Sequence, residues 1–169
     1  MNEIVESLDK QLDRVNVWLA FSEAKNVAII ALNAAIIAAL IDLNIVPEWL
    51  SISIIIAVIF STIASLISFI PGNLKETGKK TTQEKVNNML YWYDIALIGD
   101  HCEYLQRFIE RYFTDYAGKD INAHAMCLDL AEEIMENSKI TNKKCRLFKV
   151  AILIDIFVFL SCCVIMIIA

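Results

Sequence analysis

The sequence predicts an all-α membrane protein with an N-terminal transmembrane helical hairpin, a cytosolic helical bundle and a C-terminal third transmembrane helix. Two apolar runs, at about residues 27–41 and 50–70, contain no charged residue and are separated by a short turn at 43–49. A third apolar run, 148–169, contains Asp155 as its only charged residue after Lys149, which stands at its start. A helix of about 20 apolar residues, within a range of about 17–25, crosses a bilayer core. The three runs therefore predict three membrane spans.

The composition supports this class and excludes several others. Of the 169 residues 57% are hydrophobic, and the mean hydropathy of +0.54 is well above that of an ordinary soluble domain. A hairpin buried in a soluble core is the alternative, but a soluble core helix usually shows a polar stripe. The formal net charge of −5 argues against nucleic acid as a partner. The five cysteines form no C-x-x-C pair, which argues against a zinc site or a disulfide framework.

The distribution of polar residues divides the chain into four segments. Residues 1–25 are predicted to form a cytosolic amphipathic helix, 26–71 the transmembrane hairpin, 72–147 a cytosolic helical domain and 148–169 the third span. In the hairpin turn Asn44 and Pro47 are expected, because proline lacks an amide donor and favours helix starts.

The N-terminal segment has one apolar face. Apolar residues step by three and four along it, at Val5, Leu8, Leu12, Val15 and Leu19. Since no breaker follows, this helix and the first span are predicted to form one long rod. The apolar face is expected to pack on the cytosolic helices of the same chain or on a neighbouring subunit.

The periodicity within the cytosolic domain predicts a long helix over 84–116 and a second helix over about 121–135. Gly99 is a weak point of the first helix, since glycine costs about 1 kcal/mol relative to alanine. Gly118 is expected in the turn between them, with Asp120 or Asn122 as the cap of the second helix. The predicted inner face of the first helix consists of Met89, Tyr93, Ala96, Leu105, Phe108 and Tyr112.

The basic residues predict the topology. All fifteen Lys and Arg lie before residue 27 or between residues 72 and 149. The positive-inside rule then places the N-terminus and residues 72–146 in the cytosol, with the hairpin turn and the C-terminus outside.

Polar residues in or beside the spans are candidates for a membrane or gating role. Asn33 is expected to face another helix, because an amide exposed to lipid lacks partners. A carboxylate near the bilayer centre costs about 2.5–3.5 kcal/mol. Asp155 is therefore expected either to line a helix interface or water-filled path formed on oligomerisation, or to snorkel from just inside the cytosolic face. Glu23 and Lys25 are expected at the membrane boundary, where they bond water or headgroups.

Aromatic and basic residues of the cytosolic domain are candidates for ligand binding, since aromatic rings stack on bases and arginines bind phosphate. Packing of a helical bundle with a solvated charged face is the alternative explanation of the same residues. The candidates are Tyr91, Trp92, Asp94, Tyr104, Arg107 and Arg111, with Lys143 and Arg146 as a second basic position.

Motifs of catalysis do not occur in the sequence. There is no G-x-S-x-G, glycine-rich phosphate loop or H-E-x-x-H motif. His101 lies beside Cys102 and Glu103, but adjacent helical residues are expected to point in different directions. We therefore predict no enzyme, no metal site and no cofactor.

Three segments resemble the Pycsar transmembrane effector family of bacterial antiphage defence. They read FSEAKNVAIIALNAAIIAAL, NNMLYWYDIALIGDHCEYLQRF and NSKITNKKCRLFKVAI, in the order found in the family. One departure is Asn26, which follows Lys25 where the family commonly has a small residue. The matching residues are Glu23, Lys25, Ala31, Leu32 and Asn33; Asn88, Leu90, Tyr91, Trp92, Asp94, Ile95, Ala96, Glu103 and Tyr104; and Ser138, Ile140, Lys143, Arg146 and Lys149.

The resemblance implies an effector of the bacterial inner membrane that responds to cyclic CMP or cyclic UMP from a partner cyclase. Such an effector impairs membrane integrity after infection, so that the infected cell stops growing, and we expect it to form a homo-oligomer. The alternative function is a non-catalytic scaffold or assembly subunit of a membrane complex, which the apolar face of residues 5–19 motivates.

Overall fold

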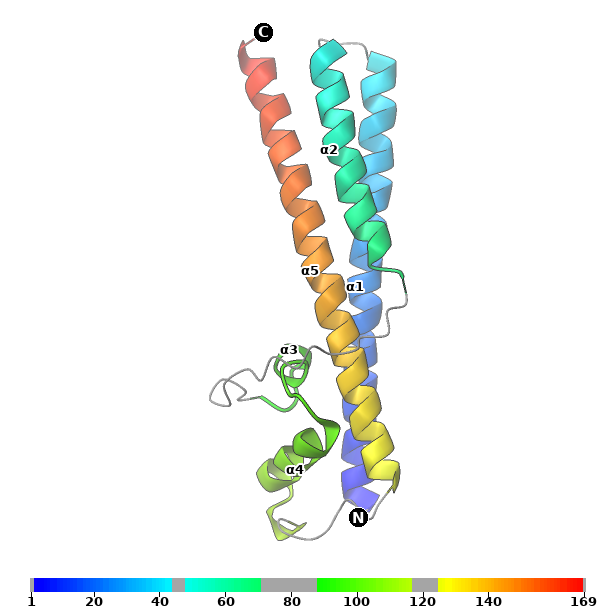
Figure 1. Cartoon of the computed structure of the whole chain (residues 1–169), viewed down its shortest axis with the longest axis vertical. Coiled ribbons are helices and arrows are strands. Elements are labelled where there is room, and N and C mark those ends of the chain that lie inside the picture. Colours follow the sequence, from blue (N-terminus) through cyan, green and yellow to red (C-terminus); the bar gives the residue numbers. More distant parts are fainter. Residues whose placement is uncertain (1, 44–47, 71–87, 117–124, 169) are drawn as a thin grey trace. The chain divides into compact units, whose positions relative to one another are not determined.

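The structure describes residues 2–43, 48–70, 88–116 and 125–168, and most of them are helical. In the computed structural model 90% of these residues are helical and none is in a strand, which confirms the all-α class (Figure 1). The elements are α1 (Asn2–Leu43), α2 (Glu48–Ile67), α3 (Trp92–Ile95), α4 (His101–Tyr112), the 3₁₀ turn η2 (Thr114–Tyr116) and α5 (Ala125–Ile168).

The chain folds as two compact units. The head unit comprises Met1–Phe21 and Asn73–Asn142, and the span unit comprises Ser22–Gly72 and Lys143–Ala169. Helices α1 and α5 each contribute residues to both units.

Two helices are much longer than a typical globular helix. Helix α1 has 42 residues, which confirms the predicted continuous rod, and α5 has 44. Neither contains glycine or proline, so nothing in the backbone chemistry interrupts them. The expectation of a separate helix ending near Met135 was wrong, because α5 continues through the basic stretch into the third apolar run. The predicted turn and caps at residues 117–122 lie outside the described residues.

The predicted helix over 84–116 was also wrong. Its first four residues lie outside the described part, and the rest forms the single turn α3 and the separate helix α4. Asp100 has extended backbone angles, φ −139° and ψ 140°, and its side chain accepts a hydrogen bond from the Glu103 backbone N–H at 3.3 Å. This is an N-cap, which starts a new helix directly after Gly99. Asn88 adds local bonds that compete with helix, since its side chain accepts from the Leu90 N–H at 2.9 Å.

The core of the head unit differs in part from the predicted inner face. Met89, Leu105 and Phe108 are buried as predicted, but Tyr93 and Tyr112 are 44% and 40% exposed. The difference in phase lies before α4, where Trp92, Ile95 and Ile98 are buried in place of Tyr93 and Ala96. The core consists of Ile4, Leu8, Leu12 and Val15 from α1, Met89, Trp92, Ile95 and Ile98 around α3, Tyr104, Leu105, Phe108 and Ile109 from α4, and Cys127, Ala131, Ile134 and Met135 from α5.

The apolar face of α1 packs against residues of the same chain. Within the head unit, the buried Gln11 amide donates to the Leu90 carbonyl oxygen at 3.0 Å. Asn137 of α5 donates to the Asn16 side-chain oxygen at 2.8 Å. These bonds fix the register of α1 against α5 and the segment before α3.

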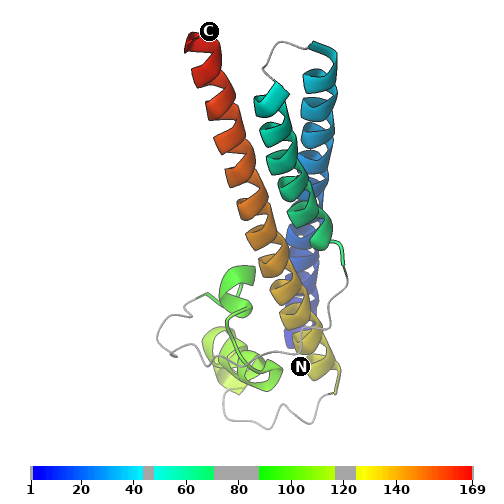
Figure 2. The same ribbon diagram turned by 45° about the horizontal axis from the view of Figure 1, so that its top comes forward.

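The span unit contains α2 side by side with the second part of α1 and of α5 (Figures 1 and 2). Ile54 and Val58 of α2 pack with Val158 of α5, while Phe60 and Phe157 are 61% and 72% exposed. An apolar surface of this kind is expected toward lipid. Three helices are long and apolar enough to cross a membrane, over Asn2–Ile41, Trp49–Ile67 and Ala125–Val164, which confirms the predicted spans. The turn residues Asn44 and Pro47 lie outside the described part.

The N-cap of α4 provides a test of the corrected helix boundary. Replacing Asp100 by alanine removes the acceptor for the Glu103 N–H and should destabilise the chain by about 1 kcal/mol. Asp100→Asn, which retains a capping oxygen, is the matched control. Its free energy of unfolding should fall by at most a few tenths of a kcal/mol. Thermal unfolding of the full chain in detergent measures both. Equal stability of all three proteins would contradict the boundary.

Candidate functional site

The span unit buries a polar centre formed by Asn33, Ser61, Thr62 and Asp155. The Asn33 amide is 1% exposed and donates to the Ser61 hydroxyl at 3.1 Å and to the Thr62 hydroxyl at 3.0 Å. The Ser61 hydroxyl in turn donates to the Ala151 carbonyl oxygen at 3.2 Å. Asn33 therefore faces another helix, and the polar centre links α1, α2 and α5.

Asp155 is the least satisfied member of the polar centre. Its side chain is 5% exposed, and neither carboxyl oxygen has a hydrogen-bond partner. The Ser61 hydroxyl donates to the Ala151 carbonyl oxygen, one helical turn before Asp155, and not to the carboxyl. The Asn33 side-chain oxygen also lacks a donor. Asp155 is thus buried within the span unit, and both of its carboxyl oxygens and the Asn33 side-chain oxygen lack donors.

A second polar cluster of the span unit surrounds Lys144. Its ammonium lies 2.7 Å from a Glu23 carboxylate oxygen and 5.2 Å from the centre of the Phe69 ring. Its carbonyl oxygen accepts from the buried Asn26 amide at 3.4 Å. The Lys25 ammonium lies 5.5 Å from the centre of the Phe148 ring. Glu23 therefore bonds a lysine of α5 that the sequence prediction did not single out.

The predicted ligand residues of the head unit do not share one surface. Trp92 is 8% and Tyr104 0% exposed, and the Tyr104 hydroxyl donates to the Met89 carbonyl oxygen at 3.4 Å. Burial raises the pKa of Tyr104 far above its usual value. Both rings thus belong to the core. Tyr91 is exposed by 42%.

The charged candidates have separate local roles. Asp94 accepts from the Asn88 backbone N–H at 3.2 Å, and Arg107 pairs with Glu103 one helical turn earlier. Arg111 is exposed in the last turn of α4. Lys143 and Arg146 belong to the span unit.

A pocket of about 260 Å³ lies in the head unit between α1, the segment before α3, and α4. Its polar side comes from α1 and its apolar side from the aromatic residues of α4. None of the predicted ligand residues lines it, and the sequence reasoning missed its basic residues. The one available signal was Gln11, a polar residue within the apolar face of α1. The main lining residues are Lys10, Gln11, Arg14, Leu90, Phe108 and Tyr112.

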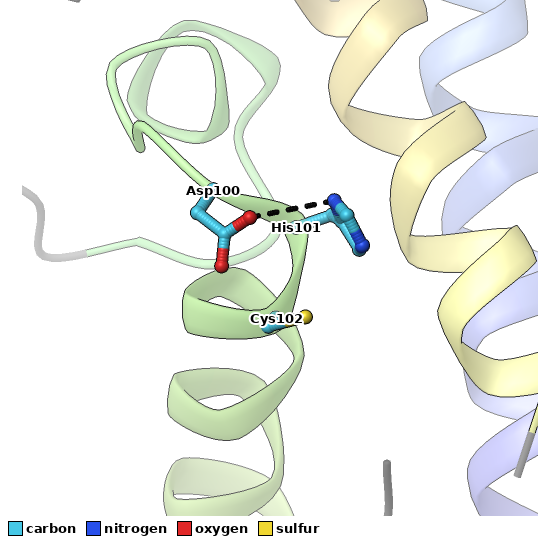
Figure 3. A group of neighbouring side chains, drawn as sticks. All are labelled: Asp100, His101 and Cys102. Atoms are coloured by element: carbon cyan, nitrogen blue, oxygen red, sulfur yellow. Dashed lines mark ion pairs between the residues drawn. The ribbon is translucent and has the colours of Figure 1, made fainter.

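Asp100, His101 and Cys102 form a further group at the start of α4 (Figure 3). Their ligand atoms lie within 4.8 Å of one another, so the expectation that these neighbours point apart was wrong. One Asp100 oxygen lies 3.5 Å from His101 Nδ1 while the other caps the helix. Partial burial and the Asp100 carboxylate raise the pKa of the Cys102 thiol, which disfavours the thiolate that binds metal. A structural zinc site takes four ligands, and this group offers three.

Comparison with known families gives one match. The family described as Pycsar effector protein domain matches residues 7–169, which include the pocket, the polar centre and all three apolar helices. A comparison with curated proteins and one with solved structures find no match. The family implies a cyclic-nucleotide-responsive antiphage effector, as distinct from a known enzyme, with a cyclase as its partner. The match over nearly the whole chain shows that this membrane protein belongs to the Pycsar effector family.

Proposed function

We propose that the chain is a membrane effector that cyclic CMP or cyclic UMP activates and that impairs the inner membrane of an infected cell. The observation that carries this proposal is the family match over residues 7–169 on a chain with three membrane-spanning helices. The signal comes from a partner nucleotide cyclase, and the outcome is abortive infection. The N-terminus and the head unit lie in the cytosol, in keeping with the positions of the basic residues.

The long helices support coupling between signal and membrane. Helices α1 and α5 each contribute residues to both units without a break. A ligand shifts a conformational equilibrium by its differential affinity for the two states. A nucleotide that prefers one packing of the head unit therefore biases the two spans that continue from it.

The polar centre supports a water-filled lesion. A buried carboxyl without a partner is costly in an apolar environment, and contact with water removes that cost. A rearranged or oligomeric state in which Asp155 and Asn33 face water is thus favoured by the same groups that are poorly satisfied in this structure. We propose that a homo-oligomer forms the lesion and that these residues line it.

The scaffold alternative has lost its main motivation. It depended on an apolar face of α1 that is free to bind another protein. In the structure Leu8, Leu12 and Val15 of that face are buried within the same chain.

The activity can be tested directly in cells. Expression of the chain alone should leave the membrane polarised, and expression with a cyclase that makes cyclic CMP or cyclic UMP should depolarise it. A potential-sensitive dye and uptake of a membrane-impermeant dye measure the change. A catalytically inactive cyclase is the control. A membrane that stays intact at saturating cyclic nucleotide would contradict the proposal.

The role of the polar centre can be tested with Asp155→Leu. Leucine has no need of water, so the substitution should favour the closed packing and reduce nucleotide-triggered dye uptake at equal expression. The carboxyl costs about 2.5–3.5 kcal/mol in the span, which would require about a hundredfold more nucleotide if all of it drives opening. Asp129→Leu, an exposed carboxylate on the same helix, is the matched control. Equal dye uptake by the Asp155 variant and the parent would rule out a path lined by Asp155.

A further inference from the structure

We propose that the pocket of the head unit is the nucleotide site, with the cyclic phosphate bound by Arg14 and Lys10 and the base stacked on Tyr112. This inference rests on the proposed function, which names the ligand class but not its site. All lining residues of the pocket belong to the head unit.

Arg14 is available to bind an anion. Arg14 lines the pocket, and its guanidinium donates to the side-chain oxygen of Gln11, another lining residue, at 3.2 Å. Among the described residues, no carboxylate forms an ion pair with it. A guanidinium has five donors in a planar fork, so one bond to Gln11 leaves most of them for the two free oxygens of a cyclic phosphate.

Lys10 adds a second positive charge one helical turn away. It pairs with Glu6 at 2.6 Å, but both side chains are about two-thirds exposed, at 70% and 67%. Exposed ion pairs of this kind contribute little to stability. The Lys10 ammonium can therefore leave Glu6 and bind a phosphate with little loss of free energy. The α1 side of the pocket therefore suits a single anionic group.

Gln11 makes this a built site and not a chance surface arrangement. Its side chain is 1% exposed, yet it lines the pocket. The Gln11 amide nitrogen donates to the Leu90 carbonyl oxygen at 3.0 Å, and the Gln11 amide oxygen accepts from the Arg14 guanidinium. One buried residue thus orients the guanidinium and fixes the opposite wall of the pocket.

The α4 side of the pocket suits a nucleobase. Tyr112 is 40% exposed and packs against the buried Phe108 ring, with centroids 5.1 Å apart and planes at 64°. The contact with Phe108 positions the Tyr112 ring. The exposed part of that ring remains available to stack on a base. Base–aromatic stacking contributes about 1–3 kcal/mol per base.

The size of the pocket is in keeping with a small ligand. Pockets for drug-sized ligands measure about 300–1,000 Å³, and this one, which is open to solvent on one side, measures about 260 Å³. That volume suits one cyclic mononucleotide.

Calorimetric titration of the full chain in detergent with cyclic CMP and cyclic UMP tests the site. Arg14→Ala should weaken binding about 10–100-fold, as expected for loss of hydrogen bonds to a charged group. Tyr112→Ala should weaken it by about tenfold, and Tyr112→Phe, which keeps the ring, should bind like the parent. Arg111→Ala removes an exposed arginine of the same unit that does not line the pocket, and should also bind like the parent.

The outcomes separate this inference from the proposed function. Binding by the parent together with unchanged binding by Arg14→Ala and Tyr112→Ala would overturn the site and leave the function standing. An equal loss in Arg111→Ala would also overturn the site, because any positive charge would then suffice. If the parent binds neither nucleotide, the proposed function fails as well. Helical circular dichroism of each variant confirms that it is folded.

Discussion

The span unit depends on the need of buried polar groups for partners on another helix. Lipid is as apolar as leucine, so apolar contacts discriminate weakly among packings of three apolar helices. The Asn33 amide, which donates to two hydroxyls of α2, and the Ser61 hydroxyl, which donates to α5, fix one arrangement. Such bonds contribute about 0.6 kcal/mol on average in membranes. The arrangement is therefore specific without being strongly held.

Asp155 is the group that this packing satisfies least. The Asn33 amide donates to the Ser61 and Thr62 hydroxyls, and the Ser61 hydroxyl donates to a backbone carbonyl oxygen. No donor is left for the Asp155 carboxyl. A partly satisfied buried network costs more than an apolar core of the same shape. The pair between Lys144 and Glu23 acts in the opposite direction, because it joins α5 to α1 at 2.7 Å. The span unit thus combines one interaction that favours the observed packing with one group that opposes it.

The sequence predicted best what depends on local chemistry. The three spans and the α1 rod follow from apolar length and the absence of breakers, and the structure confirms them. The helix over 84–116 failed because the Asp100 cap and the Asn88 side-chain bonds outweighed periodicity. In the single turn α3, before this cap, Trp92 is buried in place of the predicted Tyr93. Apolar spacing extrapolated along one continuous helix could not predict which aromatic residue of this separate short turn faces the core.

The pocket lay beyond sequence reasoning for a different reason. Aromatic residues beside arginines were the predicted ligand signal, but the head unit uses Trp92 and Tyr104 to build its core. The basic wall instead comes from α1, far from α4 in the sequence, and only tertiary packing brings the two together. The same helix carries Arg14 in the pocket and Asn33 in the polar centre. Under the proposed site, a ligand bound by Arg14 would contact the same helix that carries the Asn33 hydrogen bonds to α2.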